Sequence, residues 1–179
     1  MEKKETQDLY VFLKNKAIVF LSLREHSELD LSKKLLASAR VFLSRSDADS
    51  ISLLAGEISR EIIPKLIQEI IQELVSKNYL SNQKYAESYI RSRAKKGYGP
   101  NYFRQALRQE GLGLNLINQV LEELENNHLN INFTEIALNI LKKKFKNIDL
   151  SDYKTNQKAR KFLYDRGFDL EIIKQVNLQ

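Results

Sequence analysis

The sequence contains no cysteine, and only two histidines, two prolines and six glycines among its 179 residues. The lack of cysteine excludes disulfide scaffolds, thiolate zinc sites, iron–sulfur clusters and cysteine nucleophiles. Two histidines cannot form a three-histidine metal site, and so few glycines and prolines disfavour folds with many strands. No apolar run approaches the roughly 18–20 residues of a membrane span, and the first residues lack a signal-peptide pattern. We therefore expect a cytoplasmic protein that needs no metal and no cofactor.

Charge is distributed unevenly along the chain. The whole sequence has 29 basic and 23 acidic residues, a net charge of +6. Residues 84–108 contain seven basic side chains and one acidic one, and residues 142–161 contain eight and two, so each stretch also carries +6. Between them, residues 109–135 contain five acids and no lysine or arginine. This pattern fits either solvated helix faces or two faces that bind an acidic partner.

Apolar residues recur with the period of an α-helix through most of the sequence, including the stripe within residues 51–62. Pro64 and Pro100 each suit the first turn of a helix, and Gly111 suits the position just after one. Asn132 and Asp169 each stand where a side chain can cap a helix N-terminus. No stretch alternates with a period of two residues. The sequence therefore predicts an all-α fold.

Two segments of the sequence repeat at an offset of 56 residues. The repeat matches Leu107, Gly111, Ile117, Gln119 and Val120 to Leu163, Gly167, Ile173, Gln175 and Val176. Each copy reads as a basic helix, a second helix that ends at the glycine, and a short third helix. A first copy without the glycine is plausible over residues 17–36. Because such small units bury their apolar faces against neighbours, we predict about three tandem three-helix repeats in an elongated, curved array.

This reading divides the chain into four parts. Residues 1–43 form the N-terminal region and the first repeat, and residues 44–77 form an acidic helical insertion with a connecting helix. Residues 78–126 form the second repeat, and residues 127–179 form the third.

Three motifs occur in a fixed order along residues 17–176. The first is Ala17-Ile-Val-Phe-Leu-Ser-Leu-Arg-Glu-His-Ser27, followed by Leu31 and Lys34-Leu35. The second combines Asn78-Tyr79-Leu80, Tyr85-Ala86, Tyr89-Ile90-Arg91-Ser92-Arg93, Lys96-Gly97-Tyr98-Gly99-Pro100 and then Leu107 with Gly111-Leu112. The third is Phe162-Leu163 with Arg166-Gly167-Phe168. Together these motifs resemble the bacterial RecX family.

The resemblance implies three tandem three-helix repeats and no enzymatic activity. It also implies binding to the RecA recombinase in the groove of its filament on DNA, with effects on filament growth, ATPase, strand exchange and coprotease activity. Two features depart from the family pattern. Ser81-Asn82 replaces the usual pair of acids after Leu80, and the stretch from Leu35 to Tyr79 is longer than usual, the excess covering about residues 44–63.

The basic stretches supply the candidate binding residues. Arg91 with Lys95, and Arg104 with Arg108, lie four residues apart and so share helix faces. The first predicted face comprises Arg91, Arg93, Lys95, Lys96, Arg104 and Arg108. The possible second face comprises Lys142, Lys143, Lys146, Lys158, Arg160 and Lys161. Such cations bind DNA phosphates or the carboxylates of a protein, and the sequence does not distinguish these uses.

Other conspicuous residues have structural interpretations. We expect His26 to be a turn residue with a hydrogen-bonding role, beside Ser27 as a helix N-cap, and we expect His128 to lie in an exposed loop. The stretch 97–100 lacks the Lys-Ser/Thr ending of a phosphate-binding loop and follows no strand, so an interhelix turn is the better interpretation. Tyr98 and Tyr102 are the aromatic residues best placed for stacking on bases.

We predict a monomeric, non-enzymatic regulator that binds RecA and the RecA–DNA filament in DNA repair, homologous recombination and the SOS response. We expect it to inhibit filament extension, and direct contact with DNA is possible. The alternative is a helical module that binds nucleic acid by itself, without RecA.

Overall fold

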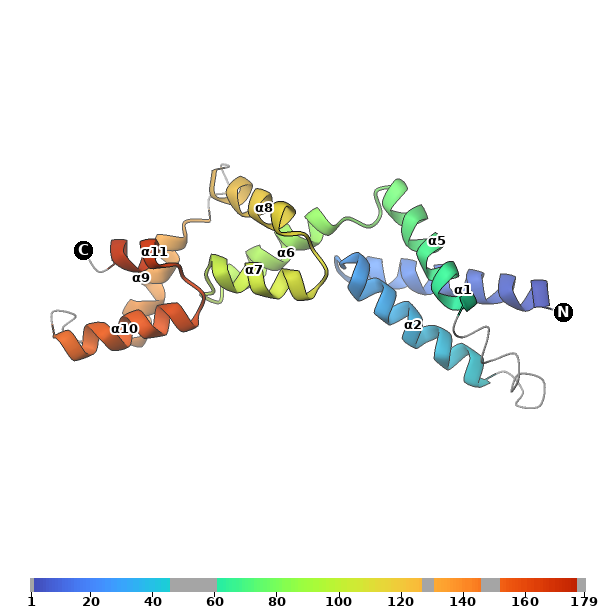
Figure 1. Ribbon diagram of the computed structural model, residues 1–179, viewed down its shortest axis with the longest axis horizontal. Coiled ribbons are helices and arrows are strands. Elements are labelled where there is room, and N and C mark those ends of the chain that lie inside the picture. The colour runs from blue at the N-terminus through green and yellow to red at the C-terminus, as the bar shows by residue number, and fades with distance from the viewer. Residues whose placement is uncertain (1, 46–60, 127–130, 146–151, 177–179) are drawn as a thin grey trace. The chain divides into compact units, whose positions relative to one another are not determined.

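The computed structural model describes residues 2–45, 61–126, 131–145 and 152–176 (Figure 1). These residues form nine α-helices and no strand, which confirms the all-α prediction. They divide into two compact units, Met1–Tyr85 and Ala86–Gln179. Among the described helices, none is long and apolar enough to cross a membrane. The stripe within residues 51–58, His128 and Lys146 lie outside the described residues.

The first unit contains α1 (Glu2–Leu23), α2 (Glu28–Arg45) and α5 (Ile63–Ser76), which pack side by side (Figure 1). Pro64 occupies the first turn of α5, as predicted. The three helices share one apolar core, made by Leu9, Leu13, Ala17, Leu31, Leu35, Ala39, Ile63, Ile67, Ile70, Ile71, Leu74 and Leu80. Helix α5, from the segment that the sequence suggested as a connection, thus supplies much of the core of this unit.

The turn between α1 and α2 is built around His26 and Ser27, both buried. Ser27 Oγ accepts a hydrogen bond from the backbone N–H of Asp30 at 2.9 Å, which confirms the predicted N-cap. The ring of His26 lies 2.7 Å from Asp30 Oδ2 and 3.2 Å from the carbonyl oxygen of Phe20. Partial burial alone raises the pKa of Asp30, but the His26 hydrogen bond and the charges of Lys34 and Arg24 outweigh it, so the pKa lies below its ordinary value. His26 therefore has the predicted hydrogen-bonding role in a turn.

The residues that replace the acids after Leu80 still support the helix that follows, α6 (Asn82–Ala94). Ser81 Oγ accepts from the N–H of Lys84 at 3.3 Å. Asn82 bonds to Glu28 twice: its Oδ1 accepts from the Glu28 N–H at 3.0 Å, and its Nδ2 donates to Glu28 Oε1 at 2.8 Å. This pair joins the start of α6 to the start of α2.

The second unit continues with α7 (Pro100–Gln109), α8 (Leu114–Asn126), α9 (Phe133–Lys144), α10 (Tyr153–Asp165) and α11 (Leu170–Val176). Pro100 begins α7, as predicted. Asn132 Oδ1 accepts from the N–H of Glu135, and Asp169 Oδ1 accepts from the N–H of Ile172, each at 2.9 Å. Both predicted N-caps are confirmed. Helices α6–α8 and α9–α11 are two successive sets of three helices.

The repeat at an offset of 56 residues has the same local geometry in both copies. Gly111 and Gly167 have φ angles of 83° and 81°, a conformation that side chains other than glycine rarely adopt. The next residues, Leu112 and Phe168, donate from their N–H groups to Leu107 and Leu163, each at 3.1 Å. This is the bond that closes a helix C-terminus in a Schellman motif. The matched apolar residues of both copies are buried, so the repeat in sequence is a repeat in structure.

Candidate functional site

The six cations of the first predicted face all lie in the second unit, on two consecutive helices and the turn between them. Arg91 and Arg93 are in the last turn of α6, where positive charge also stabilises the helix C-terminus. Lys95 and Lys96 follow that end and are exposed. Arg104 and Arg108 are on α7. The six residues thus lie on the end of one helix, on the turn that follows it and on the next helix.

Among the described residues, the side chains of two of the six cations make a hydrogen bond or a ring contact. Arg104 Nε donates to Asn118 Oδ1 at 3.0 Å, and its Nη1 donates to Asn101 Oδ1 at 2.9 Å. Arg93 lies over the ring of Tyr89, 5.6 Å from the centroid. Arg104 therefore helps to connect α7 with α8, and it is less available to a partner than the sequence suggested.

The side chains of the other four cations have no such hydrogen bond or ring contact among the residues that the structure describes. Arg91, Lys95, Lys96 and Arg108 form no ion pair with another residue in the part of the chain that the structure describes. Lys95, Lys96 and Arg108 are exposed, and Arg91 is half-buried. We call these four residues the α6–α7 cations. They are the members of the predicted face best placed to meet an external anion.

The second predicted basic face lies on α9 and α10. Lys142 and Lys143 are exposed in the last turn of α9. On α10, Lys158 and Lys161 are exposed and Arg160 is half-buried. Lys161 pairs with Asp165 at 3.2 Å, an exposed contact that contributes little to stability. The use of these residues in binding stays a prediction.

Arg166 connects the third set of helices to the turn that carries Lys95 and Lys96, a role that the sequence did not suggest. Its Nη1 donates to the carbonyl oxygen of Lys96 at 2.9 Å. Its guanidinium lies 5.3 Å from the ring centroid of Tyr98 and 5.1 Å from that of Phe162. Lys144 lies over the same Phe162 ring at 4.1 Å. Arg166 therefore holds the Lys96 turn against α10.

The backbone reinforces this connection at two glycines. The N–H of Gly99 donates to the carbonyl oxygen of Arg166 at 2.9 Å, and the N–H of Asn101 donates to that of Gly167 at 2.8 Å. A Cβ atom on Gly99 would stand 2.6 Å from the Gly167 oxygen, and one on Gly167 would stand 2.4 Å from the nitrogen of Tyr102. We call this pair of turns the glycine junction. The stretch 97–100 is thus an interhelix turn, as interpreted, and its Gly99 N–H is bonded within the chain.

The two tyrosines considered for stacking on bases are engaged within the chain. The rings of Tyr98 and Tyr102 stack on each other with centroids 4.2 Å apart. Arg166 covers Tyr98, and the hydroxyl of Tyr102 lies 3.3 Å from that of Tyr89. Their described contacts therefore belong to the packing around the glycine junction.

A signal for Arg166 exists in the sequence. It precedes Gly167 as Glu110 precedes Gly111, so the two copies of the repeat differ in the sign of charge at one matched position. This reversal of charge beside two equivalent glycines is the feature of the sequence that could have drawn attention to Arg166.

Comparison with known proteins places the chain in a family. A model described as the second three-helix domain of RecX matches residues 81–121, and one described as the third matches residues 133–176. A protein of Serratia proteamaculans named "Regulatory protein RecX" is 32% identical over 164 residues, covering 92% of this chain and 95% of that protein. The chain belongs to the RecX family. Another member with that name, from Yersinia enterocolitica, is 32% identical over 171 residues, covering 92% of this chain and 95% of its own length.

A solved structure has the same fold. The crystal structure of RecX from Lactobacillus salivarius superposes with a TM-score of 0.65 at 20% identity, covering 97% of this chain and 99% of that one. The family membership and this likeness confirm the predicted fold of helical repeats.

Proposed function

We propose that this RecX-family chain regulates the RecA recombinase by binding RecA on its DNA filament and limiting filament extension. The regulation acts through binding, without catalysis, and it lowers the filament's ATPase, strand-exchange and coprotease activities. The observation that carries this proposal is the group of four α6–α7 cations, which form no ion pair with any described residue, in a chain whose relatives are named as regulatory proteins.

The chemistry of these cations suits a filament of protein and DNA. The guanidinium groups of Arg91 and Arg108 can each bind a carboxylate or a phosphate with two parallel hydrogen bonds. Lys95 and Lys96 add two exposed point charges from the turn that Arg166 holds. Because the turn is fixed through its backbone, less conformational entropy is lost when its side chains bind.

The second basic face extends the same proposal. It belongs to the same compact unit as the α6–α7 cations. A protein that contacts the filament through both sets of charges can bridge neighbouring RecA subunits. Such bridging obstructs the conformational cycle of the subunits and blocks addition at a growing end.

The test is a titration of RecA on single-stranded DNA with this protein, following ATP hydrolysis and filament length. We expect both to fall as the protein is added. Unchanged hydrolysis together with unchanged filament length at saturating protein contradicts the proposal.

A variant tests the residues. Replacing Arg91, Lys95, Lys96 and Arg108 by Ala is expected to raise the concentration needed for inhibition by about tenfold or more. The matched control replaces four exposed cations of the first unit, Lys4, Lys33, Arg40 and Lys65, by Ala and so removes the same charge. Equal inhibition by the two variants excludes the α6–α7 cations, and a far-UV circular dichroism spectrum checks that both remain helical.

The alternative of a nucleic-acid-binding module that acts without RecA gains no support from the tyrosines, because Tyr98 and Tyr102 stack on each other. Binding to single-stranded DNA alone separates the two functions. Tight binding to DNA alone favours the alternative, provided that it is strongly salt-dependent. In that case the logarithm of the association constant falls linearly with the logarithm of the salt concentration, with a slope of about −0.9 for each phosphate neutralised.

A further inference from the structure

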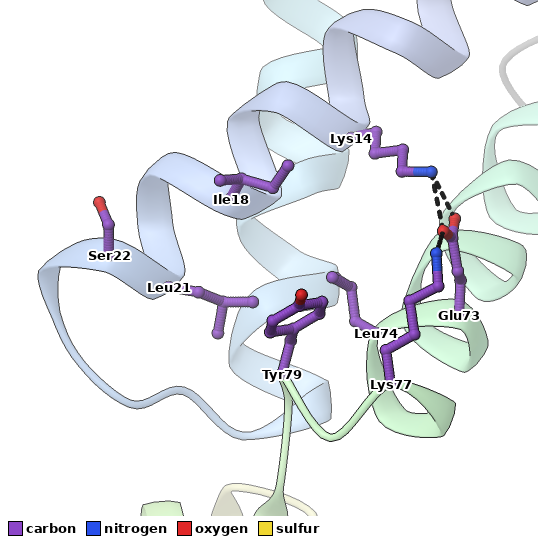
Figure 2. A pocket seen from close by; sticks show the side chains of 8 residues that line it. All are labelled: Lys14, Ile18, Leu21, Ser22, Glu73, Leu74, Lys77 and Tyr79. Carbon is purple, nitrogen blue, oxygen red and sulfur yellow. Dashed lines mark hydrogen bonds and ion pairs between the residues drawn. The ribbon is translucent and has the colours of Figure 1, made fainter.

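A groove of about 540 Å³ lies in the first unit, between α1 and the C-terminal end of α5 (Figure 2). Its apolar part is formed by Ile18 and Leu21 of α1, Leu74 of α5 and the ring of Tyr79. Ile18 and Leu21 lie three residues apart, so they fall on the same face of α1. Every residue that lines the groove belongs to the first unit, whereas the α6–α7 cations belong to the second.

The apolar side chains at the rim of the groove are exposed. Ile18 has 53% of its surface exposed and Tyr79 has 67%. Tyr79 is held there by the turn that ends α5: Asn78 has a φ of 59°, and the N–H groups of Tyr79 and Leu80 both donate to the Leu74 oxygen, at 2.9 and 3.2 Å. Because these bonds fix the backbone of Tyr79, only the two torsions of its large aromatic side chain are left to be ordered when a partner binds. Exposed apolar patches bordered by polar groups are typical of interaction sites.

One end of the groove is polar, and the charged residues that line it there are Lys14, Lys77 and Glu73 (Figure 2). Glu73 accepts hydrogen bonds from Lys14, Lys77 and the hydroxyl of Tyr10. The bonds from Lys14 and Lys77 lower the pKa of Glu73 to about 2, so it is ionised at neutral pH. Among the residues that line the groove, two ammonium groups thus face one carboxylate, and the charge of Glu69, which does not line the groove, also acts on Lys14. Each ammonium has three N–H donors, so the pair can bind a second carboxylate beside Glu73.

We propose that this groove binds a short amphipathic segment of a partner protein, with aliphatic side chains over Ile18, Leu21 and Tyr79 and a carboxylate beside Lys14 and Lys77. The charge at the polar end selects an acidic segment, and the apolar stripe of α1 suits the spacing of anchors on a helix. A protein segment fits better than a small amphiphile, because pockets for small ligands bury most of the ligand, whereas this rim is more than half exposed.

The experiment selects peptides from a random phage-displayed library on the full-length protein. The expected peptides combine Leu, Ile or Phe with Asp or Glu at helical spacing. Their affinity is expected to fall about tenfold for Ile18→Gln and for Tyr79→Ser, because each removes apolar area from the contact. Lys77→Gln should lower the affinity for the acidic peptides by about the same factor and make that affinity less dependent on salt concentration.

Matched variants control for nonspecific effects. Val19→Gln changes a neighbouring residue of α1 with 52% exposure that does not line the groove, and Tyr153→Ser changes a tyrosine of α10 with 75% exposure. Both should bind the peptides like the unaltered protein, and far-UV circular dichroism checks that each variant is helical.

Four results overturn the proposal. The first three are that no peptide is enriched over background, that Ile18→Gln and Tyr79→Ser bind the peptides as tightly as the unaltered protein does, or that the selected peptides lack acidic residues. The fourth is that laurate displaces every peptide at a concentration below the dissociation constant of that peptide. This result assigns the groove to a small amphiphile. The outcome is independent of RecA binding, because no step of the experiment contains RecA.

Discussion

Gly111 and Gly167 occupy the same position in two successive repeats, yet they have different surroundings. Their φ angles and the hydrogen bonds that follow them are nearly the same. Gly167 contacts the backbone of Tyr102 so closely that a Cβ would stand 2.4 Å from its nitrogen, and Arg166 beside it reaches Lys96 and Tyr98. Gly111 is exposed and follows Glu110.

The difference separates two uses of one motif. The glycine ends a helix in both repeats, because the left-handed conformation of the Schellman motif requires it. In the third repeat the same turn also joins the preceding set of helices. The residues that repeat therefore determine the local turn. The residue before the glycine differs between the copies, and in the third repeat this residue, Arg166, makes a contact with the preceding set of helices.

The largest expected effect separates the two glycines directly. Gly111→Ala should lower the free energy of unfolding by about 1–2 kcal/mol, because alanine is strained at a positive φ. Gly167→Ala adds a steric clash with Tyr102 to the same strain, so we expect a loss of about 3 kcal/mol or more. Urea unfolding followed by circular dichroism measures both losses. Equal losses contradict the distinction between the two turns.

The next effect concerns the residues before the glycines. Arg166→Ala removes the bond to the Lys96 oxygen and the contacts with Tyr98 and Phe162, so we expect a loss of about 1–2 kcal/mol. Glu110→Ala is the matched control and should change the free energy of unfolding by less than about 0.5 kcal/mol.

Amide hydrogen exchange sharpens this comparison. The N–H groups of Gly99 and Asn101 bond to Arg166 and Gly167, and both should exchange faster in Arg166→Ala. Unchanged exchange at both amides indicates that the side chain of Arg166 does not support the junction.

A smaller effect is expected where the third helices begin, at the matched positions Gly113 and Asp169. Asp169→Ala removes the cap on the N–H of Ile172 and should cost about 1 kcal/mol. A Cβ on Gly113 has nothing within 4 Å, so Gly113→Asp has room to supply the missing cap and should add a few tenths of a kcal/mol. Thermal unfolding of the two variants checks both signs, and a loss of stability in Gly113→Asp contradicts the second.

The smallest expected effect concerns the first unit, where side-chain contacts of Glu73, and not a close approach of two turns, contribute to stability. The pKa of Glu73 is lowered to about 2, so its stabilising contribution is present above its ordinary pKa of 4.5 and is lost as the pH falls toward 2. Glu73→Gln should remove that part of the pH dependence, whereas Asp8→Asn, at an exposed residue of α1 in the same unit, should keep it. Urea unfolding between pH 5 and 2 measures the difference, and the same slope in both variants contradicts the role of Glu73.

Much of the fold can be predicted from the sequence, because the signals are local. Pro100, Asn132 and Asp169 mark helix starts through the chemistry of one or two residues, and the structure confirms each of them. The offset of 56 residues predicted a repeated structure because the same apolar residues are buried in both copies.

The glycine junction could not be predicted, because it depends on which turns meet in space. No residue near Gly99 in the sequence indicates that this glycine approaches Gly167. The sequence also does not indicate that Tyr98 and Tyr102 stack on each other and so are not open to nucleic-acid bases. Periodicity showed that α5 has an apolar face but not that α1 and α2 cover it. Likewise, the contacts of Arg104 with Asn101 and Asn118 depend on side chains from α7 and α8 together.

The most direct test of the account is co-sedimentation of the protein with RecA filaments on single-stranded DNA. We expect the unaltered protein and the control with Lys4, Lys33, Arg40 and Lys65 replaced by Ala to sediment with the filaments at similar affinity. The variant with Arg91, Lys95, Lys96 and Arg108 replaced by Ala should bind about tenfold more weakly or worse. If the unaltered protein stays in the supernatant, or the two variants bind equally, the α6–α7 cations are not a surface for the RecA filament.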